Sequence, residues 1–172
     1  NNILLTSCPG SGKTRTLTHR LAYQVLRDPA SKKIKIAITY TNRAAEEITN
    51  RLEGMNIDQS SIWAGTIHQF CMHFIIRPYA MYSKRLCKGY RIIDDYSKKA
   101  YGREIAERLG MHLNYYDDPF QYENVRTEYK RVLKEKKEID FDAILLISEE
   151  LLASCAFIGS NIASVISSIL VD

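Results

Sequence analysis

The chain has 172 residues, of which 45% are hydrophobic and 26% charged, a balance typical of a globular protein rather than a disordered one. This length suffices for one domain with its own core, or for one domain that carries a small insertion. The net charge of +4 suits a polyanionic partner but does not identify one. The wide spacing of the cysteines excludes a small disulfide framework and predicts a reducing, cytoplasmic location. They are Cys8, Cys71, Cys87 and Cys155.

One uncharged stretch, residues 151–171, is just long enough to span a bilayer. Five serines, an asparagine and a glycine dilute its apolar character, and Glu149, Glu150 and Asp172 flank it closely. We therefore expect the end of a helix, a loop and a buried strand here, and no membrane partner. The apolar start of the chain runs directly into a Gly-rich turn rather than a cleavage site, so no signal peptide is expected.

The first 78 residues alternate between strand and helix patterns. Apolar or β-branched runs predict three strands, at residues 3–6, 34–40 and 62–67. Apolar positions at helical spacing predict three helices: one through Leu17, Leu21 and Val25 that stops at Asp28-Pro29, one over residues 43–52 that ends at Gly54, and one over residues 68–76 that ends at Arg77-Pro78. This alternation implies an α/β fold with a parallel sheet and right-handed crossovers.

Three polar segments follow the three predicted strands. They are residues 6–12, 40–43 and 66–69. Parallel sheets bind their ligands beyond the carboxyl ends of the strands, so we expect these three segments to lie on one edge of the sheet.

Residues 79–138 have a different character, since tyrosines and charges dominate and β-branched runs disappear. Two helices are predicted here, at residues 97–109, closed by Gly110, and at residues 119–137, with Asp118 as the cap. We interpret this segment as an α-helical insertion. Residues 139–172 are expected to return to the core through a helix capped by Asp140 and a final strand.

The peptide TSCPGSGKT, residues 6–14, has the composition of a phosphate-binding loop between a strand and a helix. In such a loop, backbone N–H groups surround the phosphates, a Lys reaches the β- and γ-phosphates, and a Ser or Thr binds Mg²⁺. Ser7 stands where the strict motif has Gly, and Pro9 has no N–H to donate. The alternative is a generic Gly-rich turn between a strand and a helix.

Three motifs in this order resemble the UvrD/Rep family of superfamily 1 DNA helicases. The phosphate loop is similar to the family's Walker A motif, which accepts a small residue in place of the first Gly and often has Pro before the second. AITYTNRAAEEI, residues 37–48, resembles motif Ia, and GTIHQFC, residues 65–71, resembles motif Ib. The final SILVD is similar to the strand that opens motif II. The resemblance implies a RecA-like P-loop NTPase domain and covers nearly the whole chain, most weakly over residues 79–137.

The resemblance also implies roles for individual residues. Lys13 would neutralise charge on the β- and γ-phosphates of ATP, and Thr14 and Asp172 would bind Mg²⁺, so these three are the catalytic candidates. The nucleotide-binding residues would be Cys8, Pro9, Gly10, Ser11, Gly12, Lys13, Thr14 and Arg15. The residues that contact single-stranded DNA would be Tyr40, Thr41, Asn42, Arg43, Thr66 and His68. Without the resemblance, Tyr40 would be interpreted as a strand aromatic in the core.

Other parts of the family pattern fall outside this sequence: the Glu that follows the motif II Asp, the glutamine segment that contacts adenine, and a second RecA-like domain with its arginine finger. We therefore expect the 172 residues alone to be inactive and to bind ATP weakly. The intact parent is expected to be an ATP-dependent helicase that translocates on single-stranded DNA and unwinds duplex DNA. Two alternatives stay open: another P-loop enzyme such as a small kinase or GTPase, and a degenerate module that binds nucleic acid without catalysis.

Overall fold

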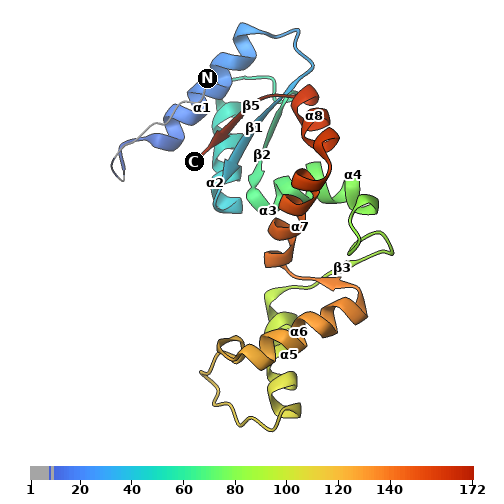
Figure 1. The fold of residues 1–172 in the computed structure, drawn as a ribbon. Helices are drawn as coiled ribbons and strands as arrows, with labels where there is room; N and C mark the ends of the chain where they lie inside the picture. The colour runs from blue at the N-terminus through green and yellow to red at the C-terminus, as the bar shows by residue number, and fades with distance from the viewer. Residues whose placement is uncertain (1–7, 9) are drawn as a thin grey trace. The chain divides into compact units, whose positions relative to one another are not determined.

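The computed structural model describes residue 8 and residues 10–172, which divide into two compact units (Figure 1). Unit 1 contains the described residues up to Phe70 together with Ala156–Asp172, and unit 2 is Cys71–Cys155. The strand predicted at residues 3–6 lies outside the described residues. The domain boundaries predicted after residues 78 and 138 differ from these divisions, because residues 71–78 and 139–155 pack within unit 2.

The sheet of unit 1 has three described strands: β1 (Ile34–Thr39), β2 (Ile62–Thr66) and β5 (Ile166–Val171). Both β2 and β5 pair with β1 in parallel, in the order β2-β1-β5, which confirms the predicted parallel sheet. Ala37 on β1 is opposite Ala64 on one side and Leu170 on the other. The carboxyl ends of the three strands therefore meet at one edge.

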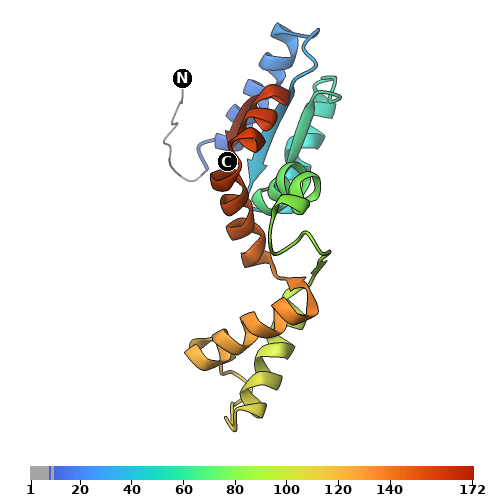
Figure 2. The same ribbon diagram turned by 45° about the vertical axis from the view of Figure 1, so that its right-hand side comes forward.

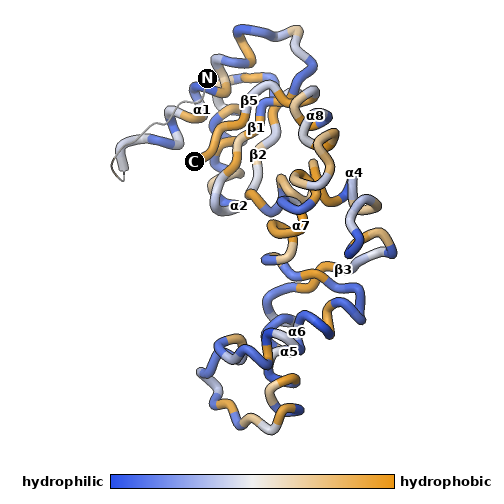
Figure 3. Tube along the Cα trace, in the orientation of Figure 1, coloured by the Kyte–Doolittle hydropathy of each residue, from blue (hydrophilic) through white to orange (hydrophobic). Residues whose placement is uncertain are grey.

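Two helices supply most of the apolar side chains that pack on this sheet. They are α1 (Lys13–Arg27), which ends before Asp28-Pro29 as predicted, and α2 (Asn42–Gly54). Leu21 of α1 and Ile48 and Leu52 of α2 are fully buried in one cluster with Ala37. Figure 3 shows apolar residues, coloured orange, along β5. The predicted helical spacing thus produces the core of unit 1.

Three details of unit 1 differ from the predictions. Gly54 belongs to α2, and the left-handed residue that ends the helix is Asn56 (φ 54°), where the N–H of Ile57 donates to the carbonyl of Leu52. The loop predicted before the last strand is a helix, α8 (Ala156–Val165), in which the burial of Ile158 outweighs the low helix propensity of residues such as Gly159 and Asn161. The predicted burial of the last strand is wrong for most of β5, because only Ile166 is buried and Ile169 and Val171 are 49% and 72% exposed.

In unit 2, two helices, α5 (Asp95–Arg108) and α6 (Glu123–Lys136), pack side by side around a second core (Figure 2). Gly102 of α5 allows the ring of Phe120, which precedes α6, to pack closely on α5, since a Cβ atom at Gly102 would lie 2.9 Å from this ring. The helix prediction for this segment is confirmed, with Gly110 in the left-handed conformation after α5. Asp118, however, caps only a 3₁₀ turn, η3 (Pro119–Gln121), and α6 begins after it.

Short elements complete unit 2. Strands β3 (Arg91–Ile92) and β4 (Glu138–Ile139) form a two-stranded parallel ladder that the sequence analysis missed, because two-residue strands carry no detectable periodicity. The predicted helix over residues 68–76 is α3 (Ile67–Phe70), which lies in unit 1, continued by a π-helix, η1 (Cys71–Ile76), in unit 2. The chain then continues through α4 (Arg77–Tyr79) and η2 (Ala80–Tyr82). Helix α7 (Phe141–Ser154) follows β4 and packs against η1.

Asp140 connects α7 to α5 and α6. Its carboxylate accepts hydrogen bonds from the N–H of Ala143 at 2.9 Å, which caps α7 as predicted, and from the hydroxyl of Tyr129 at 3.0 Å. It also lies 3.7 Å from the ammonium of Lys98. Burial and the neighbouring carboxylate of Asp140 raise the pKa of Tyr129, so its hydroxyl stays protonated and donates.

Among the described helices, none is both long and apolar enough to cross a membrane.

We predict that Asp140→Ala lowers the free energy of unfolding by roughly 2–4 kcal/mol, because it removes a helix cap and leaves the buried hydroxyl of Tyr129 without an acceptor. Urea unfolding followed by circular dichroism measures this. Asp140→Asn keeps only one of the two acceptor oxygens, so it can serve the N–H of Ala143 or the hydroxyl of Tyr129, and it is the intermediate control, expected to lose less than Asp140→Ala. Equal stability of Asp140→Ala and the unmodified chain would contradict this role.

Candidate functional site

The described part of the phosphate loop has the backbone geometry of an anion site. Gly10 (φ 77°) and Gly12 (φ 87°) are left-handed, a conformation that favours glycine, and the N–H of Ser11 donates to the carbonyl of Cys8 at 3.3 Å. Gly12 is the cap residue of α1, and no side chain of the described residues caps this helix end. The first N–H groups of α1 are thus left for a ligand, and the helix dipole favours an anionic one.

Two side chains of the first turn of α1 carry the chemistry that the sequence predicted. The ammonium of Lys13 donates to the carbonyl of Cys8 at 3.1 Å, so it lies over the loop. The hydroxyl of Thr14 donates to the carboxylate of Asp172 at 2.7 Å. Asp172 follows β5 directly, and its N–H donates to the carbonyl of Ile38 on β1 at 2.9 Å. The structure therefore brings together the two predicted Mg²⁺ ligands, 158 residues apart in sequence.

A groove with a volume of about 610 Å³ adjoins the loop. The predicted residues Gly10, Gly12, Lys13, Thr14 and Arg15 line it. The sequence analysis did not predict the other lining residues, which are His19, Glu47, Arg51 and Met55. Glu47 and Arg51 form an ion pair across one turn of α2. Their i, i+4 spacing is visible in the sequence, but only the packing of α1 beside α2 places this pair next to the phosphate loop.

Tyr40 lies where β1 ends and α2 begins, and it is 93% exposed. The alternative interpretation of Tyr40 as a core aromatic is therefore wrong. The turn around it is well held, because the hydroxyl of Thr41 accepts from the N–H of Ala44 at 3.2 Å and the hydroxyl of Thr39 donates to the carbonyl of Thr41 at 2.9 Å. Asn42 and Arg43 are exposed on the first turn of α2. The hydroxyl of Thr41 thus caps a helix, and the aromatic ring beside it is open to solvent.

The segment after β2 is held by a reciprocal capping interaction. The side-chain oxygen of Gln69 accepts from the N–H of Thr66 at 2.8 Å, and the N–H of Gln69 donates to the hydroxyl of Thr66 at 3.3 Å. Gly65 allows this arrangement, since a Cβ atom there would lie 2.9 Å from the same Gln69 oxygen. The sequence analysis did not single out Gln69, although the spacing T-x-x-Q is the signal of a capping box.

The two polar segments are neighbours on the carboxyl edge of the sheet, because Thr39 and Thr66 are register partners on β1 and β2. Tyr40 follows one of these residues, and His68, half-buried in α3, follows the other. The carboxyl edge of the sheet thus carries an exposed aromatic ring, an arginine and several polar groups after β1 and β2. Asp172 lies on the same edge, after β5. Such an edge suits a polyanion with aromatic bases.

The sheet is parallel, the Gly-rich loop leads into a helix that starts with Lys-Thr, and an Asp follows a strand of the same sheet. Together these features define a RecA-like α/β domain. A family model described as UvrD/REP helicase N-terminal domain matches residues 1–118, and the chain belongs to this family.

Curated relatives agree with the family. The chain is 26% identical to an ATP-dependent DNA helicase PcrA of Leuconostoc citreum over 88% of this chain and 24% of that protein. It is 24% identical to DNA helicase II of Escherichia coli over its whole length and 28% of that protein. A PcrA of Staphylococcus aureus is 41% identical over 44% of this chain and 10% of that protein. The chain thus spans about a quarter of the first two relatives.

We predict that Gln69→Ala lowers the free energy of unfolding by roughly 1 kcal/mol, because the N–H of Thr66 loses the acceptor that the Gln69 side chain provides, while the hydroxyl of Thr66 still caps the N–H of residue 69. Urea unfolding of the two proteins measures the difference. Gln69→Glu retains an acceptor at this position and is expected to stay close to the unmodified chain. A loss of the same size in both variants would show that the capping bond is not the cause.

Proposed function

We propose that the chain is the ATP-binding motor domain of a parent helicase that translocates on single-stranded DNA and unwinds duplex DNA. The observation that carries this proposal is the pair Thr14–Asp172 on the same sheet edge as Tyr40 and Thr66. One edge then offers both a site for Mg²⁺-bound phosphates and a surface for a nucleic-acid strand. The names of the relatives, which are DNA helicases, support this interpretation.

The proposed ATP site uses residues of the phosphate loop. The backbone of Cys8 to Gly12 and the start of α1 would surround the phosphates, with Pro9, outside the described residues, contributing no donor. Lys13 would exchange the carbonyl of Cys8 for the β- and γ-phosphates, a stronger acceptor because it is charged. Arg15 lines the same groove and would add a second cation.

The donor set at Thr14 and Asp172 fits Mg²⁺. This ion takes oxygen ligands, usually one or two from the protein together with phosphate and water oxygens. A hydroxyl and a carboxylate 2.7 Å apart supply such ligands without a dedicated cage. When bound, Mg²⁺ would neutralise phosphate charge, and the role of this chain is to hold the ion at the end of β5.

The proposed single-strand site is the surface formed by Tyr40 and the residues around it. The exposed ring of Tyr40 offers a face on which one base can stack, and Arg43 supplies positive charge for the backbone. Thr41, Asn42, Thr66 and His68 would contact the strand with polar groups.

A second RecA-like domain of the parent would close over ATP, and hydrolysis would then release the grip on the strand. The division into a RecA-like core and a helical insertion belongs to this proposal.

In the intact parent, we predict that Lys13→Ala lowers ATP hydrolysis by about 10²–10³-fold and leaves single-strand affinity nearly unchanged, because it removes one charge from the phosphates only. Phosphate release and fluorescence anisotropy measure the two effects. Lys33→Ala removes an exposed lysine before β1, at the opposite end of the strand, and is the control. Hydrolysis that survives in Lys13→Ala would contradict the nucleotide site.

We also predict that Tyr40→Ala weakens binding of a poly-thymidine strand by about 1–3 kcal/mol, because the stacking face is lost. Tyr40→Phe keeps the ring and is expected to bind as the unmodified parent does. Fluorescence anisotropy at fixed salt measures both.

A parent ATPase that single-stranded DNA does not stimulate would favour a kinase or GTPase, and strand binding without any ATPase would favour the degenerate module.

A further inference from the structure

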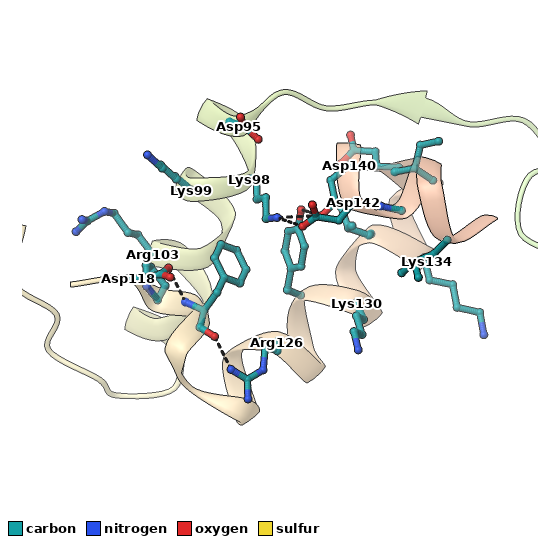
Figure 4. A pocket seen from close by; sticks show the side chains of 18 of the residues that line it. Asp95, Lys98, Lys99, Arg103, Asp118, Arg126, Lys130, Lys134, Asp140 and Asp142 are labelled. Carbon is teal, nitrogen blue, oxygen red and sulfur yellow. Dashed lines mark hydrogen bonds and ion pairs between the residues drawn. The ribbon is translucent and has the colours of Figure 1, made fainter. Parts of the chain in front are cut away.

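Unit 2 contains a large cleft that the proposed function does not use. It has a volume of about 1350 Å³ and lies among α5, α6, the loop of residues 111–118 and the start of α7 (Figure 4). Phe120, Tyr129 and Leu133 are among its apolar lining residues. Lys98 reaches across it from α5 toward Asp140 and Asp142. The cleft therefore has an apolar floor and one cluster in which a single ammonium pairs with two carboxylates.

The charges around this cleft are unequal. Ten Lys or Arg residues and six Asp or Glu residues line it, an excess of four positive charges. Five of the six acids already have partners within unit 2. Asp140 and Asp142 pair with Lys98, Glu138 pairs with Arg91, Asp117 accepts from the N–H of Asn114, and Asp118 accepts from the N–H of Phe120. The backbone hydrogen bonds leave the charges of Asp117 and Asp118 in place, so the basic character of the cleft comes from the larger number of lysines and arginines among its lining residues.

Six of the ten cations have exposed side chains that form no ion pair or hydrogen bond with the described residues. They are Lys84, Arg85, Lys88, Lys99, Lys130 and Lys134. Lys130 and Lys134 project from α6 (Figure 4), and their i, i+4 spacing corresponds to a rise of about 6 Å along the helix. Adjacent phosphates of an extended strand are separated by a comparable length. Uncompensated cations at this spacing favour a linear polyanion.

The loop beside these cations carries two exposed aromatic side chains. Tyr115 is 83% exposed and Tyr116 is 94% exposed, with their rings edge to face at 5.4 Å. The loop is held in place, because Arg103 donates to the carbonyl of Tyr115 and lies over its ring at 5.7 Å, and Asp117 accepts from the N–H of Asn114 at 2.7 Å. Two tyrosines on a braced loop lose little conformational entropy when a flat ligand stacks on them.

We propose that this cleft is a second binding surface for single-stranded DNA, with phosphates at Lys130 and Lys134 and bases stacked at Tyr115 and Tyr116. An acidic peptide would use the lysines but would gain nothing from the rings. A duplex hides the faces of its bases, so it would also leave the rings unused. The proposal rests on the proposed function and deepens it by adding a contact on the helical insertion.

The test compares two double variants of the intact parent, with poly-thymidine and an abasic strand of equal length as probes. Tyr115→Ala/Tyr116→Ala is expected to weaken poly-thymidine binding at least about fivefold and to leave abasic binding unchanged. Lys130→Ala/Lys134→Ala is expected to weaken both probes and to reduce the salt slope by about 1.4, since each phosphate contact contributes about 0.7.

Matched controls for this test lie outside the cleft. Tyr96→Ala removes another tyrosine of unit 2 that is 83% exposed, and Lys32→Ala/Lys33→Ala removes two exposed lysines of unit 1; both should bind as the parent does. Near-ultraviolet circular dichroism checks that each variant is folded.

Three results would overturn the cleft proposal. If both double variants bind single-stranded DNA with unchanged affinity while Tyr40→Ala still weakens binding, the cleft is not a binding surface for the strand. The proposed function would be unaffected by this result. An equal loss on blunt duplex, or full competition by polyglutamate with no effect of the tyrosines, would assign the surface to a duplex or to an acidic peptide. A parent that binds no single strand at all would instead overturn the proposed function.

Discussion

The hydrogen bond from Thr14 to Asp172 is the contact on which the candidate site depends. It joins the first turn of α1 to the end of the last strand, and it exists only because β5 pairs with β1 in parallel. The N–H of Asp172 continues that ladder to Ile38, so the carboxylate is held by backbone pairing rather than by a flexible loop. A hydroxyl and a carboxylate held in this way need little reorganisation to receive a cation, which is the advantage of a preorganised site.

The same sheet geometry explains why the two proposed functions of unit 1 occur together. Parallel strands end at one edge, and β1 and β2 are each followed there by a helix whose first turn must be capped. Thr41 and Thr66 provide those caps, so their hydroxyls hold the turns in place. Tyr40 is then held in an exposed position by a rigid turn. We interpret the threonines as residues that position the surface and Tyr40 as the residue that contacts the strand.

Unit 2 uses a different constraint, the buried carboxylate of Asp140. Its partners Tyr129, Lys98 and Ala143 come from α6, α5 and α7. Although partial burial lowers the pKa of Lys98, its hydrogen bond to Asp142 and the charge of Asp140 outweigh this effect and raise the pKa above its ordinary value. Lys98 therefore stays charged and offsets one of the two negative charges of Asp140 and Asp142, whereas the exposed lysines that line the cleft form no ion pair with the described residues.

The sequence by itself determined the helical stripe of Leu17, Leu21 and Val25, the caps at Asp140 and Gly110, the parallel character of the sheet and the motifs that resemble one helicase family. These follow from periodicity and from side chains that act on their own backbone. Only the tertiary structure decided which distant groups meet, such as Glu47 and Arg51 beside the phosphate loop, the β3–β4 ladder and the uncompensated lysines around the cleft. Contacts of this kind depend on how elements pack, and packing leaves no periodic signal along a single chain.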